Sequence, residues 1–153
     1  MGKADYKRAR KNERGASLVE FSIAATVFLI SIFAVLEFGR ALWVHNALAD
    51  AARKGARYAV LHNASAGANV KNVVVYGDPA GGSSPVVDNL DVSNVNVTYA
   101  ANYGLDKDTV TVSITGYQFQ FVLPIGATSI QMPNYSTTLM AECAGTGECA
   151  GQP

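Results

Sequence analysis

One carboxylate, Glu20, lies at the edge of a long apolar run, and it is the first side chain to which a chemical role can be assigned. Residues 21–36 contain no charged side chain, and a charged group at the centre of a membrane helix costs about 2.5–3.5 kcal/mol. We expect Glu20 either to stay hydrated near the lipid headgroups or to pair with a cation inside an assembly. A cut between Gly15 and Ala16 would create such a cation, the new α-amine of a neighbouring subunit or of the same chain.

The two cysteines, Cys143 and Cys149, are the next pair of residues that could react. If this part of the chain lies outside the cytoplasm, they are expected to persist as a disulfide, and two free thiols are the alternative. A metal site would need more ligands, and His45 and His62 lie far away in the sequence. We therefore expect no metal and no cofactor.

Catalytic constellations are not visible in the sequence. Ser17, Ser22 and Ser31 fall in or beside the apolar run and have no nearby general base that could activate a hydroxyl. A nucleophile, a general base and an oxyanion donor would all have to be assembled for hydrolysis. We expect a protein that is not an enzyme.

The net charge of zero conceals two oppositely charged ends. Residues 1–14 carry six basic and two acidic side chains, whereas residues 61–153 carry two basic and seven acidic ones. A basic arm of this kind could bind nucleic acid, but here it directly precedes an apolar run. Basic residues beside a spanning helix stay cytoplasmic. The pattern therefore indicates membrane topology, with no nucleic-acid partner, and the arm itself is expected to be disordered or removed.

The apolar run is long enough to cross a membrane. Counted from Ala16, it approaches the ~20 residues that span ~30 Å of hydrocarbon, and the rest of the chain is too small to surround a helix that is apolar on all sides. A removed signal peptide is not expected, because the small-residue site at residues 47–49 is separated from the run by Glu37 and Arg40.

The helix is expected to continue beyond the membrane, over residues 16–60. Alanine recurs between positions 47 and 59, which favours helix and leaves a thin surface that another helix or a sheet can approach closely. At ~1.5 Å per residue such a helix is about 65 Å long, so its second half would stand outside the bilayer.

The remaining residues, 61–153, read as a β-rich domain. Strands are expected at residues 70–76, 92–99, 110–114, 117–123 and 135–142, where β-branched or alternating apolar residues occur. Gly116 is expected to introduce a bulge or tight bend. The aromatic residues at 117, 119 and 121 are expected to belong to the sheet core. The fold class is therefore α+β, a long N-terminal transmembrane helix packed on a small antiparallel sheet.

Three segments of the sequence resemble a known family. The segment GASLVEF, at residues 15–21, resembles the processing box of type IV prepilins, with glycine before the cut, glutamate at the fifth mature position and an aromatic residue at the sixth. The segments EFGRALW at 37–43 and AARKGARYA at 51–59 are similar to the TadE-like family, minor pilins or pseudopilins of the bacterial tight-adherence (Flp, type IVc) pilus. Many members have Leu-Pro where Thr26-Val27 stands here, so an unkinked helix is expected.

The resemblance implies a pilin-like fold and a role in assembling or initiating an adhesion pilus. It implies that a prepilin peptidase removes residues 1–15 by cutting between Gly15 and Ala16, and that Glu20 and Phe21 serve assembly through charge pairing. The implied partners are that peptidase, other pilins and minor pilins, the assembly platform and membrane lipid. The chain would cross the bacterial inner membrane once, with its N-terminus cytoplasmic and its C-terminal domain periplasmic or extracellular. The alternative is a bitopic, membrane-anchored binding module that captures a surface ligand or partner without entering a filament.

Overall fold

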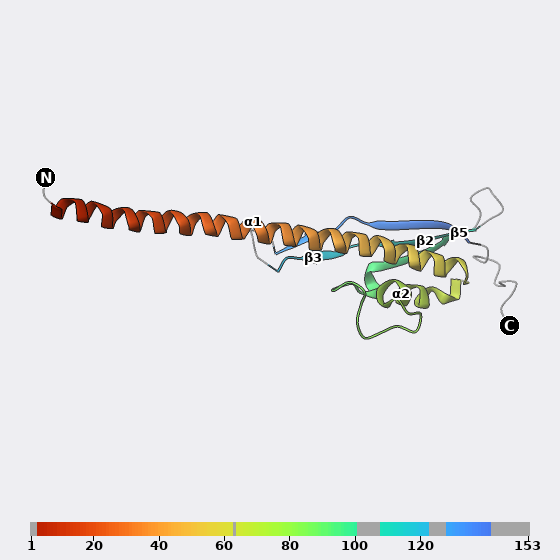
Figure 1. The fold of residues 1–153 in the computed structure, drawn as a ribbon. Helices are drawn as coiled ribbons and strands as arrows, with labels where there is room; N and C mark the ends of the chain where they lie inside the picture. The colour runs from red at the N-terminus through yellow and green to blue at the C-terminus, as the bar shows by residue number, and fades with distance from the viewer. Residues whose placement is uncertain (1–2, 63, 101–107, 123–127, 142–153) are drawn as a thin grey trace. The chain divides into compact units, whose positions relative to one another are not determined.

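The computed structural model describes residues 3–62, 64–100, 108–122 and 128–141, and the chain divides into two compact units, residues 1–40 and 41–153. The helix α1 (Lys3–Val60) supplies all the described structure of the first unit and the first element of the second (Figure 1). It ends where the sequence predicts and is unbroken through Thr26 and Val27.

The N-terminal end of α1 differs from our expectation. Residues 3–14 are helical, whereas we expected this basic segment to be disordered or removed. Alanine, lysine, arginine and glutamate are all good helix formers, and the segment has no proline, so nothing in it stops the helix from extending. Disorder was therefore the wrong prediction, while removal of residues 1–15 stays a prediction.

In the second unit α1 packs through small side chains, as the alanine pattern predicts. Its buried residues are Val44, Leu48, Ala51, Ala52, Ala56 and Ala59. Gly55 lies on the same face, and a Cβ atom added there would overlap Cγ2 of Val74 and come within 3.4 Å of Cγ1 of Val112. The absence of a side chain at Gly55 is thus what lets the next helix and the sheet approach α1.

The strand that we predicted at residues 70–76 is wrong. After a short 3-10 helix η1 (Ala64–Ala66), this segment forms the helix α2 (Gly67–Tyr76). Val70, Val74 and Val75 are buried, and the four-residue spacing of the first two places them on one helical face. Burial of that face outweighs the weak preference of valine for strands. The helix ends at Gly77, whose positive φ of 77° lets its N–H donate to the carbonyl of Val73 at 3.0 Å.

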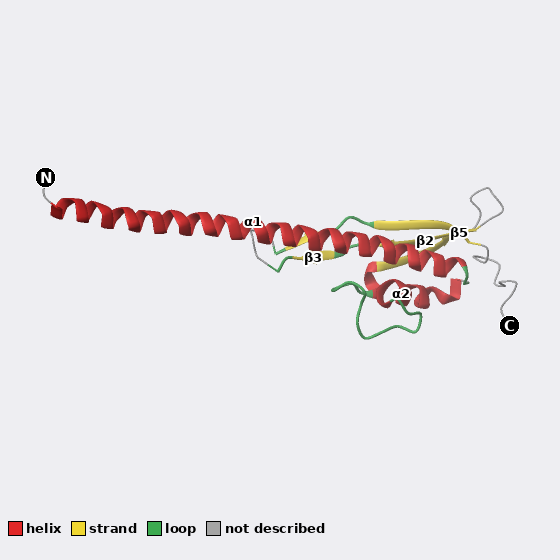
Figure 2. Ribbon diagram, viewed as in Figure 1, coloured by secondary structure: helices red, strands yellow, loops and turns green. Residues whose placement is uncertain are grey.

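The main sheet has three antiparallel strands in the order β1-β2-β5, namely β1 (Val95–Ala100), β2 (Asp108–Ile114) and β5 (Tyr135–Ala141) (Figure 2). The strand predicted at residues 92–99 begins three residues later than expected, at Val95, because a 3-10 helix η2 (Val92–Asn94), capped by Asp91, precedes it. Val110, Val112 and Ile114 alternate along β2 and are all buried. An antiparallel sheet and a long helix confirm the α+β class.

A separate hairpin follows β2. Gly116, with a φ of 71°, bends the chain, and β3 (Gln118–Gln120) then pairs with β4 (Ser129–Gln131) in a sheet of its own. The predicted strand at residues 117–123 is therefore shorter than expected, and β4 was not predicted. The aromatic stripe does belong to the core: Tyr117 and Phe119 are buried and Phe121 is partly buried against them.

Candidate functional site

The apolar segment of α1 presents its large side chains to the outside in every direction. Between residues 18 and 36 the exposed fractions run from 41% to 71%. An exposed apolar surface of this extent is unfavourable in water and indicates burial in lipid or against other helices. The exposed residues are Leu18, Val19, Phe21, Ile23, Val27, Phe28, Leu29, Ile30, Ile32, Phe33, Val35 and Leu36.

The hydroxyl groups of this segment are satisfied within the helix itself. Ser22 donates to the carbonyl of Leu18, Thr26 to that of Ser22 and Ser31 to that of Val27, each at 2.8 Å. In an apolar environment an unpaired hydroxyl would be costly, and a bond to the carbonyl four residues earlier removes that cost. The three polar residues are therefore compatible with a lipid-facing helix.

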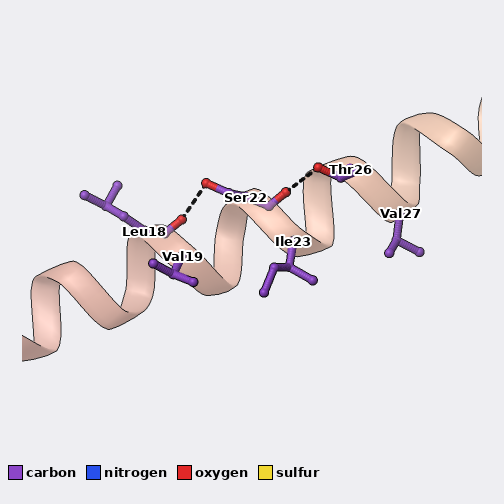
Figure 3. A pocket seen from close by; sticks show the side chains of 6 residues that line it. All are labelled: Leu18, Val19, Ser22, Ile23, Thr26 and Val27. Atoms are coloured by element: carbon purple, nitrogen blue, oxygen red, sulfur yellow. Dashed lines mark hydrogen bonds between the residues drawn. The ribbon is translucent and has the colours of Figure 1, made fainter.

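A shallow groove runs along the first turns of the segment. Ser22 and Thr26, with their short side chains, are among the six residues that line it (Figure 3). Leu18, Val19, Ile23 and Val27 complete the lining. Almost all of its surface is apolar, so it offers a contact surface for a chain or lipid tail and has no chemistry of its own.

The predicted processing and pairing residues lie on consecutive turns at the start of the apolar segment. Gly15, Ala16, Glu20 and Phe21 are all helical and exposed, with Phe21 at 71%. Within the part of the chain that the structure describes, no ion pair includes Glu20. The structure thus brings these residues onto one continuous helix and shows Glu20 accessible to a partner outside the chain.

Two contacts near the end of the apolar segment were missed by the sequence reasoning. Glu37 and Arg40 form an ion pair at 3.1 Å, which their i,i+3 spacing could have indicated. The second contact joins His45 to β5, since the Nδ1 atom of His45 lies 2.8 Å from the hydroxyl of Tyr135. No local signal could have found this pair, because its members are ninety positions apart in the sequence. Burial raises the pKa of Tyr135 above its ordinary value.

Two further predictions concern a disulfide and a metal site. Cys143 and Cys149, the predicted disulfide, lie outside the described residues. Among the described residues there is no group of three or more His, Cys, Asp or Glu side chains that could hold a metal ion.

Comparison with known proteins bears on the helix alone. Residues 15–57 match the model of the family described as TadE-like protein, which confirms the resemblance inferred from the sequence. No curated protein and no solved structure matches the chain. Within the described residues, one helical segment, Gly15–Val60, is long and apolar enough to cross a membrane by length and composition. The match suggests involvement in the Tad pilus system and interaction with other pilus components, in a family that is in general not enzymatic.

Proposed function

We propose, from the TadE-like segment at residues 15–57, that this chain is a minor pilin or pseudopilin that takes part in assembly or initiation of a Tad/Flp-type adhesion pilus. The observation that carries the proposal is the coincidence of this match with the exposed apolar part of α1. A helix of this kind needs a membrane before assembly and other helices after it. Among the described residues of the C-terminal domain, no group of three or more His, Cys, Asp or Glu side chains could hold a metal ion.

The proposed topology follows from charge. The six basic residues within positions 1–14 would hold the N-terminus in the cytoplasm, so residues 61–153 would lie in the periplasm or outside the cell. The membrane in question is the inner membrane, where a prepilin peptidase would cut between Gly15 and Ala16 at the cytoplasmic face.

The spacing of charges along α1 explains why Glu20 would need a partner. Glu37 follows Glu20 by seventeen positions, which is about 25 Å of helix at ~1.5 Å per residue. With the Glu37–Arg40 pair at the far boundary of a ~30 Å hydrocarbon layer, the Glu20 carboxylate would lie about 5 Å inside the near boundary. In a filament there are no headgroups at all. The α-amine of Ala16, freed by cleavage in a neighbouring subunit or in the same chain, would then neutralise it.

The mass of the intact protein extracted from membranes tests the proposal. We expect an N-terminus at Ala16 in cells with an active prepilin peptidase, and the full leader in cells that lack the peptidase. A chain that retains Met1 through Gly15 in the presence of active peptidase would exclude processing. It would favour the alternative, a bitopic anchor whose outer domain binds a ligand or partner without entering a filament.

A further inference from the structure

Two arginines lie on one exposed face of α1 in the second unit. Arg53 and Arg57 are both exposed, and their i,i+4 spacing places them on neighbouring turns, where like charges slightly repel each other. Lys54, next to Arg53 in the chain, is bound to Asp50 on the same helix at 2.9 Å. No ion pair of the described residues includes either arginine. We call Arg53 and Arg57 the arginine pair.

The rest of the second unit has the opposite charge. Residues 61–153 carry seven acidic and two basic side chains. Three of the acidic side chains, Asp78, Asp88 and Asp91, are exposed in the described part of this segment, and none of the three belongs to an ion pair there. The unit therefore has unpaired positive charge on α1 and unpaired negative charge outside it.

The main sheet shows which part of the unit lies beside which part of α1. Tyr135 pairs with Ile114 across β5 and β2. The hydroxyl of Tyr135 lies 2.8 Å from Nδ1 of His45. The end of the sheet that holds Ile114 and Tyr135 is therefore beside His45.

Two of the exposed aspartates, Asp88 and Asp91, lie at this same end of the sheet. The carbonyl of Asp88 accepts a hydrogen bond at 2.8 Å from the hydroxyl of Tyr117, just beyond the end of β2. Asn94, three residues after Asp91, accepts at its carbonyl from the N–H of Thr115 at 2.8 Å, again directly after β2. We call Asp88 and Asp91 the acidic pair.

The arginine pair and the acidic pair lie at different levels along α1. Arg53 and Arg57 follow His45 by eight and twelve positions, which is about 12 and 18 Å of helix at ~1.5 Å per residue. The acidic pair lies near the level of His45, and an ion pair needs a separation of about 4 Å or less. A second copy of the chain, shifted along α1 by about this distance, would bring its acidic pair to the level of the arginine pair.

We propose that the arginine pair of one copy binds the acidic pair of a second copy that is shifted along α1 by about 12–18 Å. This inference rests on the proposed function, because assembly of pilus subunits is what would bring copies of the chain together. The two surfaces are different parts of the chain, so the contact is heterologous and can repeat from copy to copy. A shift without rotation keeps α1 running in the same direction in both copies.

Charge complementarity favours a second copy over an anionic lipid surface. A lipid surface would attract the arginine pair, but it would repel Asp50 on the same helix and the exposed aspartates of the rest of the unit. A second copy presents aspartates where the first presents arginines. Because all these charges are exposed, the contact should set the register between copies and weaken with salt, since the screening length falls from about 10 Å at 0.1 M to about 3 Å at 1 M.

Exchange of charges in the full chain, purified in a mild non-ionic detergent, tests the contact. Sedimentation velocity at about 0.05 M and 0.5 M salt measures self-association. Arg53→Glu reverses one charge of the arginine pair, and Asp88→Lys reverses one charge of the acidic pair. Asp88 is preferred to Asp91, whose side chain caps η2. Lys71→Glu, on α2, is the matched control, because it changes the net charge by the same amount as Arg53→Glu.

We expect Arg53→Glu and Asp88→Lys each to weaken self-association about three- to tenfold at the lower salt concentration, and Lys71→Glu to leave it unchanged. An equal mixture of the Arg53→Glu and Asp88→Lys proteins, and a chain that carries both changes, should recover the natural strength. Absence of self-association in the natural chain, or no recovery in either the mixture or the double variant, would overturn the contact. Weaker binding of Arg53→Glu to phosphatidylglycerol vesicles, with unchanged self-association, would assign the arginines to lipid and also overturn it.

The mass of the membrane-extracted protein keeps this result separate from the proposed function. Processing at Ala16 without recovery by charge exchange would leave the pilin proposal standing and remove the contact. Recovery by charge exchange in a chain that retains residues 1–15 in cells with active peptidase would do the reverse.

Discussion

At the scale of single residues, the two carboxylates at the ends of the apolar segment, Glu20 and Glu37, differ in whether they have a cation beside them. Arg40 lies within 3.1 Å of Glu37, so this carboxylate has a cation on its own helix. Glu20 forms no ion pair among the described residues and is exposed. The Glu37 carboxylate therefore has its cation before assembly, whereas the Glu20 carboxylate gains more from a cation that assembly supplies.

Replacing Glu20→Gln should reduce pilus assembly severely without reducing membrane insertion. The amide keeps the size of the side chain and removes the charge that would attract the α-amine of a processed subunit. Sheared pili and total membranes, probed for the protein in parallel, separate the two effects. Asp50→Asn is the control, because it removes a carboxylate from an exposed surface pair with Lys54 at 2.9 Å, and such pairs contribute little. Normal pili with Glu20→Gln would contradict the charge pairing.

At the scale of elements, residues 41–60 of α1 form the helix against which the rest of the second unit packs. Its alanines, together with Gly55, bring α2 and β2 close to the helix backbone, and His45 attaches β5 by its hydrogen bond to Tyr135. This arrangement explains why a domain with only short strands can hold a defined core.

Gly55→Ala should lower the free energy of unfolding by about 1–3 kcal/mol, because the added methyl group overlaps Val74 in a closely packed core. Gly39→Ala is the matched control on the same helix, since a Cβ atom there meets nothing within 4 Å. It should leave stability unchanged or raise it by up to about 1 kcal/mol. Urea unfolding of the full chain in mild detergent, followed by circular dichroism, measures both. Equal stability of the two variants would contradict the close approach at Gly55.

At the scale of the whole molecule, the described core contains no buried charged residue but does contain phenol groups. The hydroxyl of Tyr99 is buried without a hydrogen-bond partner among the described residues, and Tyr135 is buried against His45. Burial raises the pKa of both phenols above the ordinary value of 10.0. The folded state therefore favours their neutral forms.

The stability of the domain should consequently fall in alkaline solution. A raised folded-state pKa contributes stability that is fully present below pH 10 and is lost as the pH rises through the folded-state value. We expect the urea midpoint to decrease above about pH 10, and Tyr99→Phe and Tyr135→Phe each to make this decrease smaller. Comparison with the same variants at pH 7 separates titration from lost packing. An alkaline decrease of unchanged size in both variants would rule out these phenols as its cause.

The sequence alone determined the long helix, its exposed apolar segment, the TadE-like resemblance and the alternating strand β2. These features depend on local composition and periodicity, which are visible wherever a segment is long or strongly patterned. Glu20 and Gly15 could be singled out for the same reason, because their significance lies in their positions relative to the apolar run. Their proposed roles in processing and pairing remain predictions.

Only the tertiary structure decided how the second unit is assembled. The valines of α2 suggested a strand, and burial of Val70 and Val74 on one helical face overrode that preference. The contact between His45 and Tyr135 joins residues ninety positions apart, and the strand β4, Ser129–Gln131, is too short to show a pattern of its own. Short elements carry too little local signal to outweigh such contacts, so the pairing of β3 with β4 in a separate sheet could be known only from the folded chain.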